Sequence, residues 1–427
     1  MSPERTVGPQ ARASGVVRVP GDKSASHRAL MLSALADGVS TITGLSAGHD
    51  VQATRRIVEQ MGALTTRVDA RVIVEGPLNG LHGDPGTFYC GNSGTTMRLL
   101  AGLVSGVPGL HRLTGDASLS QRPMDRVAAP LNLMGGDVRG EGPRHTAPLS
   151  VVGTNELRGL EYTIPVPSAQ VKSAILLAGL SATGPSELRE SIRTRTTTED
   201  MMRQAGLNVR STDHAEGRTI TLTPGRPRRQ SWRIPGDPSQ AAFFAVLGAI
   251  HDNADVTVSS IDASPERIGF VNVLRRMGAH VELQTIAEGT SLRTTSAGLR
   301  ATDVHADEIP SVDEVPVLTV AAAAAAGITR FCNMGELRLK ESDRFVGSMQ
   351  LAELLGCRVW CDDDDFFVEG LSSARAFLNF SIDSRLDHRI VMASAVAAVA
   401  GSGGTIIGSE TVATSYPSFF DDLASLT

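Results

Sequence analysis

Two patterns of hydrophobic and polar positions alternate along the chain and predict a repeating helix-and-strand fold. Segments such as AQVKSAILLAGL (169–180) are apolar on almost every side, which is typical of helices buried inside a domain. Segments such as RRIVEQMGA keep one polar side, which predicts helices that face solvent. Short runs rich in Val and Thr, such as ADVTVSSI (254–261), predict strands. The chain is therefore expected to be an α/β (α+β) protein.

The glycines that follow the polar-sided helices recur at a nearly constant spacing. They are separated by 73, 71, 72 and 78 residues, and a glycine at this place fits a left-handed helix C-cap. The apolar helices are expected to start near residues 26, 94, 169, 239, 313 and 387. These spacings predict six copies of a unit of about 72 residues, each with one buried and one outer helix. The glycines are Gly62, Gly135, Gly206, Gly278 and Gly356.

A second repeat, a short run that contains a Pro-Gly pair, predicts how the six copies divide between domains. The run RVPGDKS (18–24) reappears as RIPGDPS (233–239), three copies later, and Pro-Gly pairs suit a crossover of the chain. We therefore expect one discontinuous domain of residues 1–20 and 236–427, and a second domain of residues 21–235. Each holds three copies, and a cleft between two such domains is the expected place for a ligand.

Polar and cationic residues gather at the predicted N-terminal ends of the buried helices. A Ser, Thr or Asp at such a position is most often an N-cap. Capping does not explain Lys23, Arg28, Arg98 or Arg389, because a cation at a helix N-terminus opposes the helix dipole. Further charges follow in the runs around Arg122, Arg195 and LKESDR (339–344). Several arginines near carboxylates indicate a multiply charged anionic ligand together with acid–base chemistry.

Composition and motifs exclude several other classes. The 427 residues carry a formal net charge of −6, which argues against a general nucleic-acid binder, and 41% hydrophobic residues without a long apolar run argue against a membrane span. The four cysteines show no secreted-type spacing, and we expect a cytoplasmic protein. The chain has no G-x-x-x-x-G-K-[ST], no G-x-G-x-x-G after a strand and no H-E-x-x-H, which argues against a P-loop, a dinucleotide site and a metal site of that spacing.

Six motifs in order resemble the 5-enolpyruvylshikimate-3-phosphate (EPSP) synthase family, the 3-phosphoshikimate 1-carboxyvinyltransferases. They are VPGDKSASHRA (19–29), GNSGTTMR (91–98), SLSQRPMDR (118–126), PSAQVKSAILLAGL (167–180), LKESDR (339–344) and DHRIVMASAV (387–396). The resemblance implies an enolpyruvyl transferase fold, an inside-out α/β barrel with two domains of three βαβαββ repeats around buried helices. Ala169 and Thr414 resemble the second class of this family.

The resemblance also implies the reaction and its residues. Phosphoenolpyruvate and shikimate 3-phosphate would react at the 5-hydroxyl to give the enolpyruvyl ether and phosphate, in aromatic amino acid (chorismate) biosynthesis, in a protein that is usually a monomer. Lys23, Asp313 and Glu341 would be catalytic. The residues implied for shikimate 3-phosphate are Lys23, Ser24, Arg28, Ser168, Ala169, Gln170, Arg195, Asp313 and Lys340. Those implied for phosphoenolpyruvate are Lys23, Asn92, Gly94, Arg122, Gln170, Arg344 and Arg389.

One departure from the family pattern leaves alternatives open. Where the family usually has R-D-H-T-E, this chain has R-T-T-T-E (195–199), so a paralogue that uses another anionic hydroxy acceptor is one alternative. A non-catalytic ligand-binding relative is another, although Lys23, Asp313 and Glu341 argue against it. The UDP-N-acetylglucosamine enolpyruvyl transferases share the fold and donor, but Ala117 stands where that family has a reactive Cys.

Overall fold

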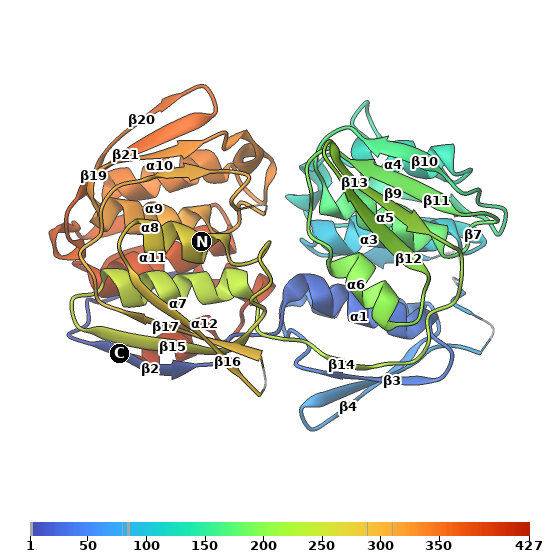
Figure 1. Ribbon diagram of the computed structural model, residues 1–427, viewed down its shortest axis with the longest axis horizontal. Coiled ribbons are helices and arrows are strands. Elements are labelled where there is room, and N and C mark those ends of the chain that lie inside the picture. The colour runs from blue at the N-terminus through green and yellow to red at the C-terminus, as the bar shows by residue number, and fades with distance from the viewer. Residues whose placement is uncertain (1–2, 79, 83–85, 288, 310) are drawn as a thin grey trace. The chain divides into compact units, whose positions relative to one another are not determined.

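A computed structural model describes residues 3–78, 80–82, 86–287, 289–309 and 311–427 (Figure 1). The chain divides into two compact domains by its internal contacts. The continuous domain is Lys23–Ile234, and the split domain combines Met1–Asp22 with Pro235–Thr427. Each domain has its own cluster of buried hydrophobic residues. Each domain therefore has a hydrophobic core of its own, and each is described by itself below.

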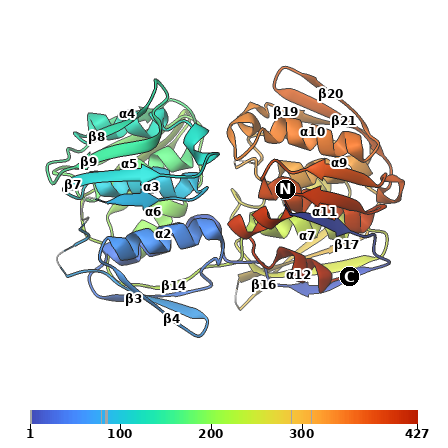
Figure 2. The same ribbon diagram turned by 180° about the vertical axis from the view of Figure 1, so that it is seen from behind.

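The continuous domain is built around three inner helices. These are α1 (Lys23–Leu35), α3 (Gly94–Ser105) and α5 (Ala169–Gly179), and most of their residues are buried. The outer helices α2 (His49–Gln60), α4 (Asp125–Leu133) and α6 (Thr197–Gln204) each keep a polar, exposed side. Figure 2 shows α2 on the surface of this domain. The two kinds of helix predicted from the apolar pattern are both present.

Three four-stranded sheets enclose these inner helices. In each sheet the first two strands are parallel and the others are antiparallel, which is the pattern of a βαβαββ unit. The first sheet has the order β14 (Ser231–Arg233), β3 (Val39–Thr43), β5 (Arg71–Glu75), β4 (Leu64–Val68). The second is β6 (Thr87–Tyr89), β7 (Gly109–Thr114), β9 (Thr146–Gly153), β8 (Asp137–Glu141). The third is β10 (Glu161–Ile164), β11 (Ser186–Glu190), β13 (Gly217–Leu222), β12 (Val209–His214).

The split domain repeats this plan. Its inner helices are α7 (Pro238–Ile250), α9 (Val315–Ala324) and α11 (His388–Ala400), and every residue of α7 and α9 is buried. Its outer helices are α8 (Gly269–Arg276), α10 (Arg344–Leu354) and α12 (Phe419–Ala424). Short 3-10 helices are η1 (Leu119–Gln121) in the continuous domain and η2 (Gly335–Leu339), η3 (Ala374–Ala376) and η4 (Ser409–Thr414) here. The predicted mixed α/β class, with buried helices inside sheets, is confirmed.

The sheets of the split domain include strands from the start of the chain. One sheet has the order β16 (His280–Ile286), β17 (Gly289–Thr295), β15 (Ala254–Ile261), β2 (Ala13–Val17), and another β18 (Asp303–His305), β19 (Ala326–Cys332), β21 (Asp365–Leu371), β20 (Arg358–Asp362). The last sheet has three strands, β1 (Glu4–Val7), β23 (Gly404–Ile407) and β22 (Phe380–Asp383). Here β1, antiparallel to β23, occupies the place that β5, β9 and β13 take in the other domain.

The predicted glycine caps end five outer helices in the same way. Gly62, Gly135, Gly206, Gly278 and Gly356 all have positive φ, between 78° and 101°. In each case the residue after the glycine donates its N–H to the carbonyl five positions earlier, as Gly136 does to Leu131 at 3.0 Å. This is the Schellman arrangement, which satisfies a carbonyl left free at a helix C-terminus.

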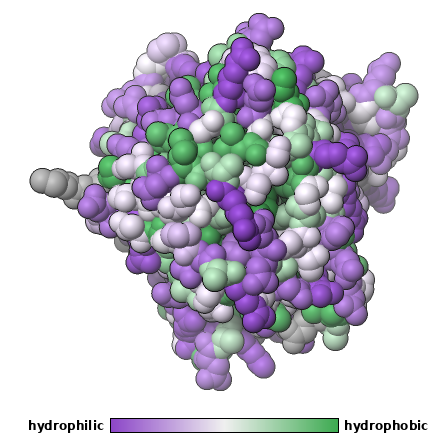
Figure 3. Space-filling view, turned by 90° about the vertical axis from the view of Figure 1, so that its left-hand side faces the viewer, coloured by the Kyte–Doolittle hydropathy of each residue, from purple (hydrophilic) through white to green (hydrophobic). Residues whose placement is uncertain are grey.

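The surface of the split domain is mixed. Figure 3 shows a group of apolar side chains near the middle of one face, surrounded by hydrophilic ones. Among the described residues, no helix is both long and apolar enough to cross a bilayer.

Candidate active site

The inner helices of the continuous domain run in register, so their N-terminal ends share one end of the domain. Gln170 Nε2 donates to Thr95 Oγ1 at 3.0 Å, and each is the second residue of its helix. Arg28 Nη2 in α1 donates to Ser173 Oγ in α5 at 2.7 Å. Ser168 caps α5 through its hydroxyl, which accepts from the Val171 N–H at 3.3 Å. The expected polar residues therefore come together at this end.

Arg122 and Asn92 form a fixed pair beside Gly94. Arg122 Nη2 donates to Asn92 Oδ1 at 2.7 Å, and Asn92 Nδ2 donates to Asp116 Oδ2 at 2.7 Å. Gly94 is the first residue of α3, and a Cβ placed there would lie 3.3 Å from Arg122 Nη1. Only a hydrogen side chain leaves this guanidinium where it is. The pair can present donors to a carboxylate or phosphate.

Gln170 is oriented by a second arginine. Arg98 Nη1 donates to Gln170 Oε1 at 2.7 Å, and Arg98 Nη2 donates to the Pro123 carbonyl at 3.2 Å. Arg98 therefore links α3, α5 and the segment after Arg122. Ala169, the first residue of α5, lies between the capping Ser168 and Gln170.

Lys23 and Arg28 lie on the first two turns of α1. Lys23 Nζ is 3.0 Å from Asp50 Oδ2, and their side chains are 16% and 5% exposed. The Arg28 guanidinium donates to Thr198 Oγ1 at 2.5 Å and to the Ser24 carbonyl at 2.8 Å. These contacts keep both cations ordered. Arg195 lies half-buried in the segment between β11 and α6.

Arg344 is the centre of the corresponding cluster in the split domain. Its Nη1 lies 2.8 Å from Asp313 Oδ1, its Nη2 2.6 Å from Glu341 Oε2 and its Nε 2.8 Å from Asp387 Oδ2. The Arg344 side chain is 1% exposed, whereas those of Asp313 and Glu341 are 25% and 16% exposed. One buried guanidinium thus orients two carboxylates that solvent or substrate can reach.

The three carboxylates keep Arg344 charged. Burial alone would lower the pKa of its guanidinium, but Asp387, Glu341 and Asp313 outweigh burial and the net direction is upward.

Arg389 also lies near the cluster around Arg344, whereas Lys340 pairs with a carboxylate outside this cluster. Arg389 Nη2 is 3.8 Å from Asp313 Oδ2, and its Nη1 donates to the Ser239 carbonyl at 2.9 Å. Lys340 Nζ instead lies 3.3 Å from Glu336 Oε1. The sequence predicts Asp313 at the start of a helix, but α9 begins at Val315 and Asp313 lies in the preceding turn.

The turn before Asp313 is strained. Val312 has φ of 50°, a left-handed conformation that is rare for a β-branched residue. Val312 is 4% exposed, so packing holds it there. Strain of this kind costs on the order of 1–3 kcal/mol and is commonest at functional sites. Val312 lies directly before Asp313 in this turn.

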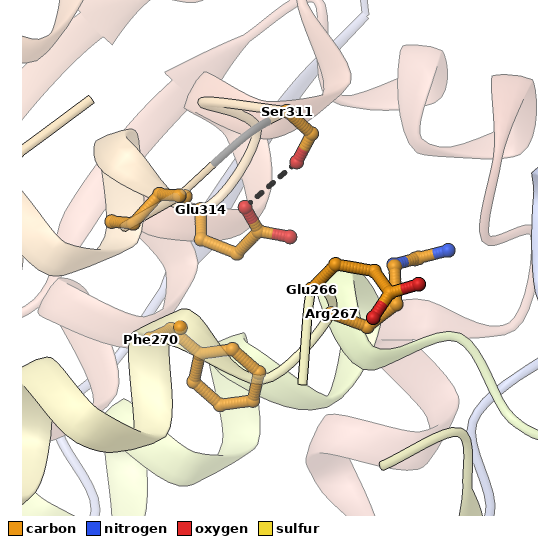
Figure 4. A pocket seen from close by; sticks show the side chains of 7 residues that line it. Glu266, Arg267, Phe270, Ser311 and Glu314 are labelled. Atoms are coloured by element: carbon orange, nitrogen blue, oxygen red, sulfur yellow. Dashed lines mark hydrogen bonds between the residues drawn. The ribbon is translucent and has the colours of Figure 1, made fainter. Parts of the chain in front are cut away.

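A small hollow with no room for even a water-sized molecule lies beside this turn (Figure 4). Ser311 Oγ donates to Glu314 Oε2 at 2.9 Å, and Arg267 lies across the hollow, paired with Asp237 at 3.0 Å. No predicted site residue lines the hollow, so it is support for the Asp313 turn.

The structure adds partners that sequence patterns did not reveal. Asp50 opens an outer helix, where an acid normally complements the dipole, yet it pairs with Lys23. Asp116 fixes Asn92, and Asp387 fixes Arg344. Only Asp387 stands in a charged motif that sequence analysis could single out. Within the described ranges, no group of three or more His, Cys, Asp or Glu side chains could hold a metal ion.

Comparisons with known proteins define first the class and then the family. The fold is that of an enolpyruvyl transferase: the enolpyruvyl transferase NikO from Streptomyces tendae matches with a TM-score of 0.77 over 100% of this chain and 97% of that one, at 18% identity. An EPSP synthase from Acinetobacter baumannii matches with a TM-score of 0.86 and 37% identity, covering 99% and 98% of the two chains. At 18% identity the first likeness concerns the fold alone.

Sequence comparison gives the family. The family model described as EPSP synthase (3-phosphoshikimate 1-carboxyvinyltransferase) matches residues 7–423. The 3-phosphoshikimate 1-carboxyvinyltransferase of Synechococcus sp. is 42% identical over 96% of this chain and 95% of its own, and that of Streptococcus uberis 38% over 96% and 97%. The chain belongs to the EPSP synthase family. Its reaction is transfer of the enolpyruvyl group to shikimate 3-phosphate in aromatic amino acid biosynthesis, and the family's substrates are phosphoenolpyruvate and shikimate 3-phosphate.

Proposed function

We propose that the clusters of the two domains act in the same reaction, with the continuous domain binding mainly the acceptor and the split domain supplying the carboxylates. Each of the two substrates carries one carboxylate and one phosphate group. Lys23, Arg28, Arg122 and Arg195 in one domain, and Lys340, Arg344 and Arg389 in the other, offer cations for these four groups. The proposal extends the family's reaction to particular side chains of this chain.

Shikimate 3-phosphate is assigned to the N-terminal ends of α1 and α5. Ser24 and Arg28 would hold its carboxylate, and Ser168, Arg195 and Lys340 would hold its phosphate, with Lys23, Ala169 and Gln170 alongside. The common end of α1 and α5 supports this assignment, because helix N-termini present free N–H groups to anions.

Phosphoenolpyruvate is assigned to the cations that surround Gly94 and Asp313. Lys23, Arg122, Gln170, Arg344 and Arg389 would hold its carboxylate and phosphate, and Asn92 and Gly94 would form the adjoining wall. The bonds that order Arg122 and Gln170 support this assignment, since pre-ordered donors lose little entropy on binding.

Two carboxylates and an ammonium are proposed for proton transfer. Asp313 removes the proton from the 5-hydroxyl as its oxygen bonds to carbon 2 of phosphoenolpyruvate, while Glu341 with Lys23 delivers a proton to the methylene carbon. The resulting tetrahedral intermediate loses phosphate as the C–O bond to phosphate breaks. One of the same groups, acting in the reverse role, then takes a proton from the methyl carbon, and the double bond of the enolpyruvyl ether forms.

The observation that carries this mechanism is the pair of partly exposed carboxylates on buried Arg344. The experiment is release of inorganic phosphate from phosphoenolpyruvate by wild type and Asp313→Asn, with and without shikimate 3-phosphate, in the presence of EDTA. We expect release that needs the acceptor, and a loss of about 10²–10⁴-fold in kcat for D313N.

The matched control is Asp307→Asn, which changes an exposed carboxylate in the same domain. D307N should keep wild-type kcat. Full activity of D313N would remove Asp313 from the mechanism, and loss of wild-type activity in EDTA would contradict our further proposal that no metal or organic cofactor takes part.

We also propose a cytoplasmic monomer that binds neither nucleic acid nor membrane, with the Ala169 and Thr414 pattern of the family's second class. Sedimentation of the pure protein tests its oligomeric state.

A further inference from the structure

An ion triad that the substrate assignments do not use is buried in the continuous domain. Lys172 Nζ lies 2.9 Å from Glu190 Oε2 and 2.7 Å from Glu199 Oε1. The side chains of Lys172, Glu190 and Glu199 are 0%, 1% and 0% exposed. Burying three charges is costly, and two well-packed apolar residues would often serve stability as well. We therefore expect the triad to have a role other than stabilising the fold.

Each member of the triad belongs to an element that borders one loop. Glu190 is the last residue of β11, Glu199 lies in the first turn of α6, and the loop 191–196 joins them. The ammonium of Lys172 also donates to the Thr194 carbonyl at 3.5 Å, and the Thr194 hydroxyl donates to Glu190 Oε1. A single cation thus holds the start, the middle and the end of this loop.

A second set of bonds ties the end of the loop to the acceptor site. Thr198 Oγ1 accepts from Arg28 Nε at 2.5 Å and lies 2.6 Å from Ser173 Oγ. Both α1 and α5 are therefore connected to the start of α6. Arg195 stands between the two anchored points, directly after Thr194.

We propose that Lys172, with Glu190 and Glu199, is a positioning residue that presents Arg195 to the phosphate of the acceptor. This inference rests on the proposed role of Arg195 in binding shikimate 3-phosphate. Arg195 is half-buried on a short irregular segment, so its guanidinium needs a fixed backbone to meet an anion without a large entropy loss. The triad provides that fixed backbone, and its own side chains are buried.

Binding and steady-state kinetics of Lys172→Met, Arg195→Ala and the double variant test the proposal. K172M should weaken shikimate 3-phosphate binding about tenfold or more, equivalent to about 1.4 kcal/mol, and should leave KM for phosphoenolpyruvate within about twofold. In the R195A background, K172M should weaken binding by less than about twofold, because it acts through Arg195. Losses that multiply, or an equal rise in both KM values, would overturn the inference.

A milder variant decides the matter if K172M does not fold. Glu190→Gln keeps the size of the side chain and removes the charge, and Glu187→Gln on the same strand is the control, since Glu187 makes an exposed pair with Arg189. E190Q should speed amide hydrogen exchange over residues 191–198 and weaken acceptor binding, whereas E187Q should do neither. Unchanged exchange in E190Q would overturn the inference.

The proposed function can fail separately. If R195A binds shikimate 3-phosphate as wild type does, Arg195 is not an acceptor contact, whatever the exchange of the loop shows. If R195A weakens binding and E190Q leaves both binding and exchange unchanged, the role of Arg195 stands and the role of the triad falls.

Discussion

Gly94 lies where any side chain must move a guanidinium. A Cβ there would be 3.0 Å from Arg98 Nη1 and 3.3 Å from Arg122 Nη1. Gly94→Ala should therefore displace the donors assigned to phosphoenolpyruvate and raise its KM about tenfold, or about 1.4 kcal/mol, with KM for shikimate 3-phosphate nearly unchanged. Initial rates at varied concentrations of each substrate check this. Gly298→Ala, at a glycine with open space around it, is the control.

His27 makes stability depend on pH. Burial, with the charges of Lys23 and Arg28, lowers the pKa of this imidazole well below 6.5. Between that lowered pKa and about 6.5, the unfolded chain binds a proton that the folded chain does not. The contribution of His27 is thus complete above about pH 6.5 and is lost as the pH falls, by at most about 1.4 kcal/mol per pH unit.

Denaturant unfolding of wild type and His27→Gln between pH 5 and 7.5 measures this contribution. The free energy of unfolding of H27Q should fall less steeply on acidification than that of wild type. His214→Gln changes an exposed imidazole and should keep the wild-type slope. Equal slopes for H27Q and wild type would show that His27 titrates alike in both states.

Sequence patterns singled out the residues assigned to the substrates more readily than the partners that hold them. Lys23 could be singled out because a cation at a helix N-terminus opposes the helix dipole, and Arg122 and Arg344 because they stand in charged runs near the predicted buried helices. Asp50 could not, because it lies 27 positions from Lys23 and is an ordinary acid at the start of an amphipathic helix. The triad around Lys172 is hidden for the same reason: its members come together only when β11, α5 and α6 pack.

The outer helices show how local chemistry fixes an element boundary. Each of five ends at a glycine with positive φ, and that feature could be predicted because only glycine enters this region without strain. The starts of helices were less predictable. The LKESDR run (339–344) lies mostly before α10, whose first residue is Arg344 and whose cap is Asp343. Because of this offset, Glu341 lies before the start of the helix, where its carboxylate pairs with Arg344.

Gly135→Ala isolates the cost of the left-handed cap. A Cβ at Gly135 meets no atom within 4 Å, so the substitution adds conformational strain without a clash. The free energy of unfolding should fall by about 1–2 kcal/mol, and by less for Gly135→Asn, since asparagine tolerates this conformation better. Chemical denaturation of both variants checks the order. A stability loss in G135N equal to that in G135A would argue against strain as the cause.

At the scale of the molecule, the two domains divide the assigned residues unequally. Seven of the nine residues assigned to shikimate 3-phosphate lie between Lys23 and Arg195, within the continuous domain, whereas Asp313 and Glu341 belong to the split domain. The six helix-and-strand copies could be predicted from the repeat, whereas the βαβαββ order of each copy was implied by the family resemblance. The place of β1 in the last sheet could not be predicted, because the residues ERTV (4–7) do not indicate that they pair with a strand about 400 residues away.

A fragment of residues 23–234 should fold alone, since it has its own core. It should bind shikimate 3-phosphate more weakly than the full chain and release no phosphate from phosphoenolpyruvate, because it lacks both carboxylates. Calorimetric titration and a phosphate assay check these outcomes, with the Arg28→Ala fragment as the non-binding control. Phosphate release by the fragment would contradict the proposed division of roles.

The pairing of β1 with β23 also affects the order in which the strands can pair during synthesis. Thr6 in β1 and Thr405 in β23 lie side by side although they are 399 residues apart in the sequence. In the same way, β2 cannot pair until β15 has been synthesised. At about 5–20 residues per second of synthesis, the first strand emerges on the order of 20–80 s before its neighbour exists. Meanwhile the continuous domain has been completed. β1 is therefore synthesised long before its partner and stays unpaired until β23 has been made.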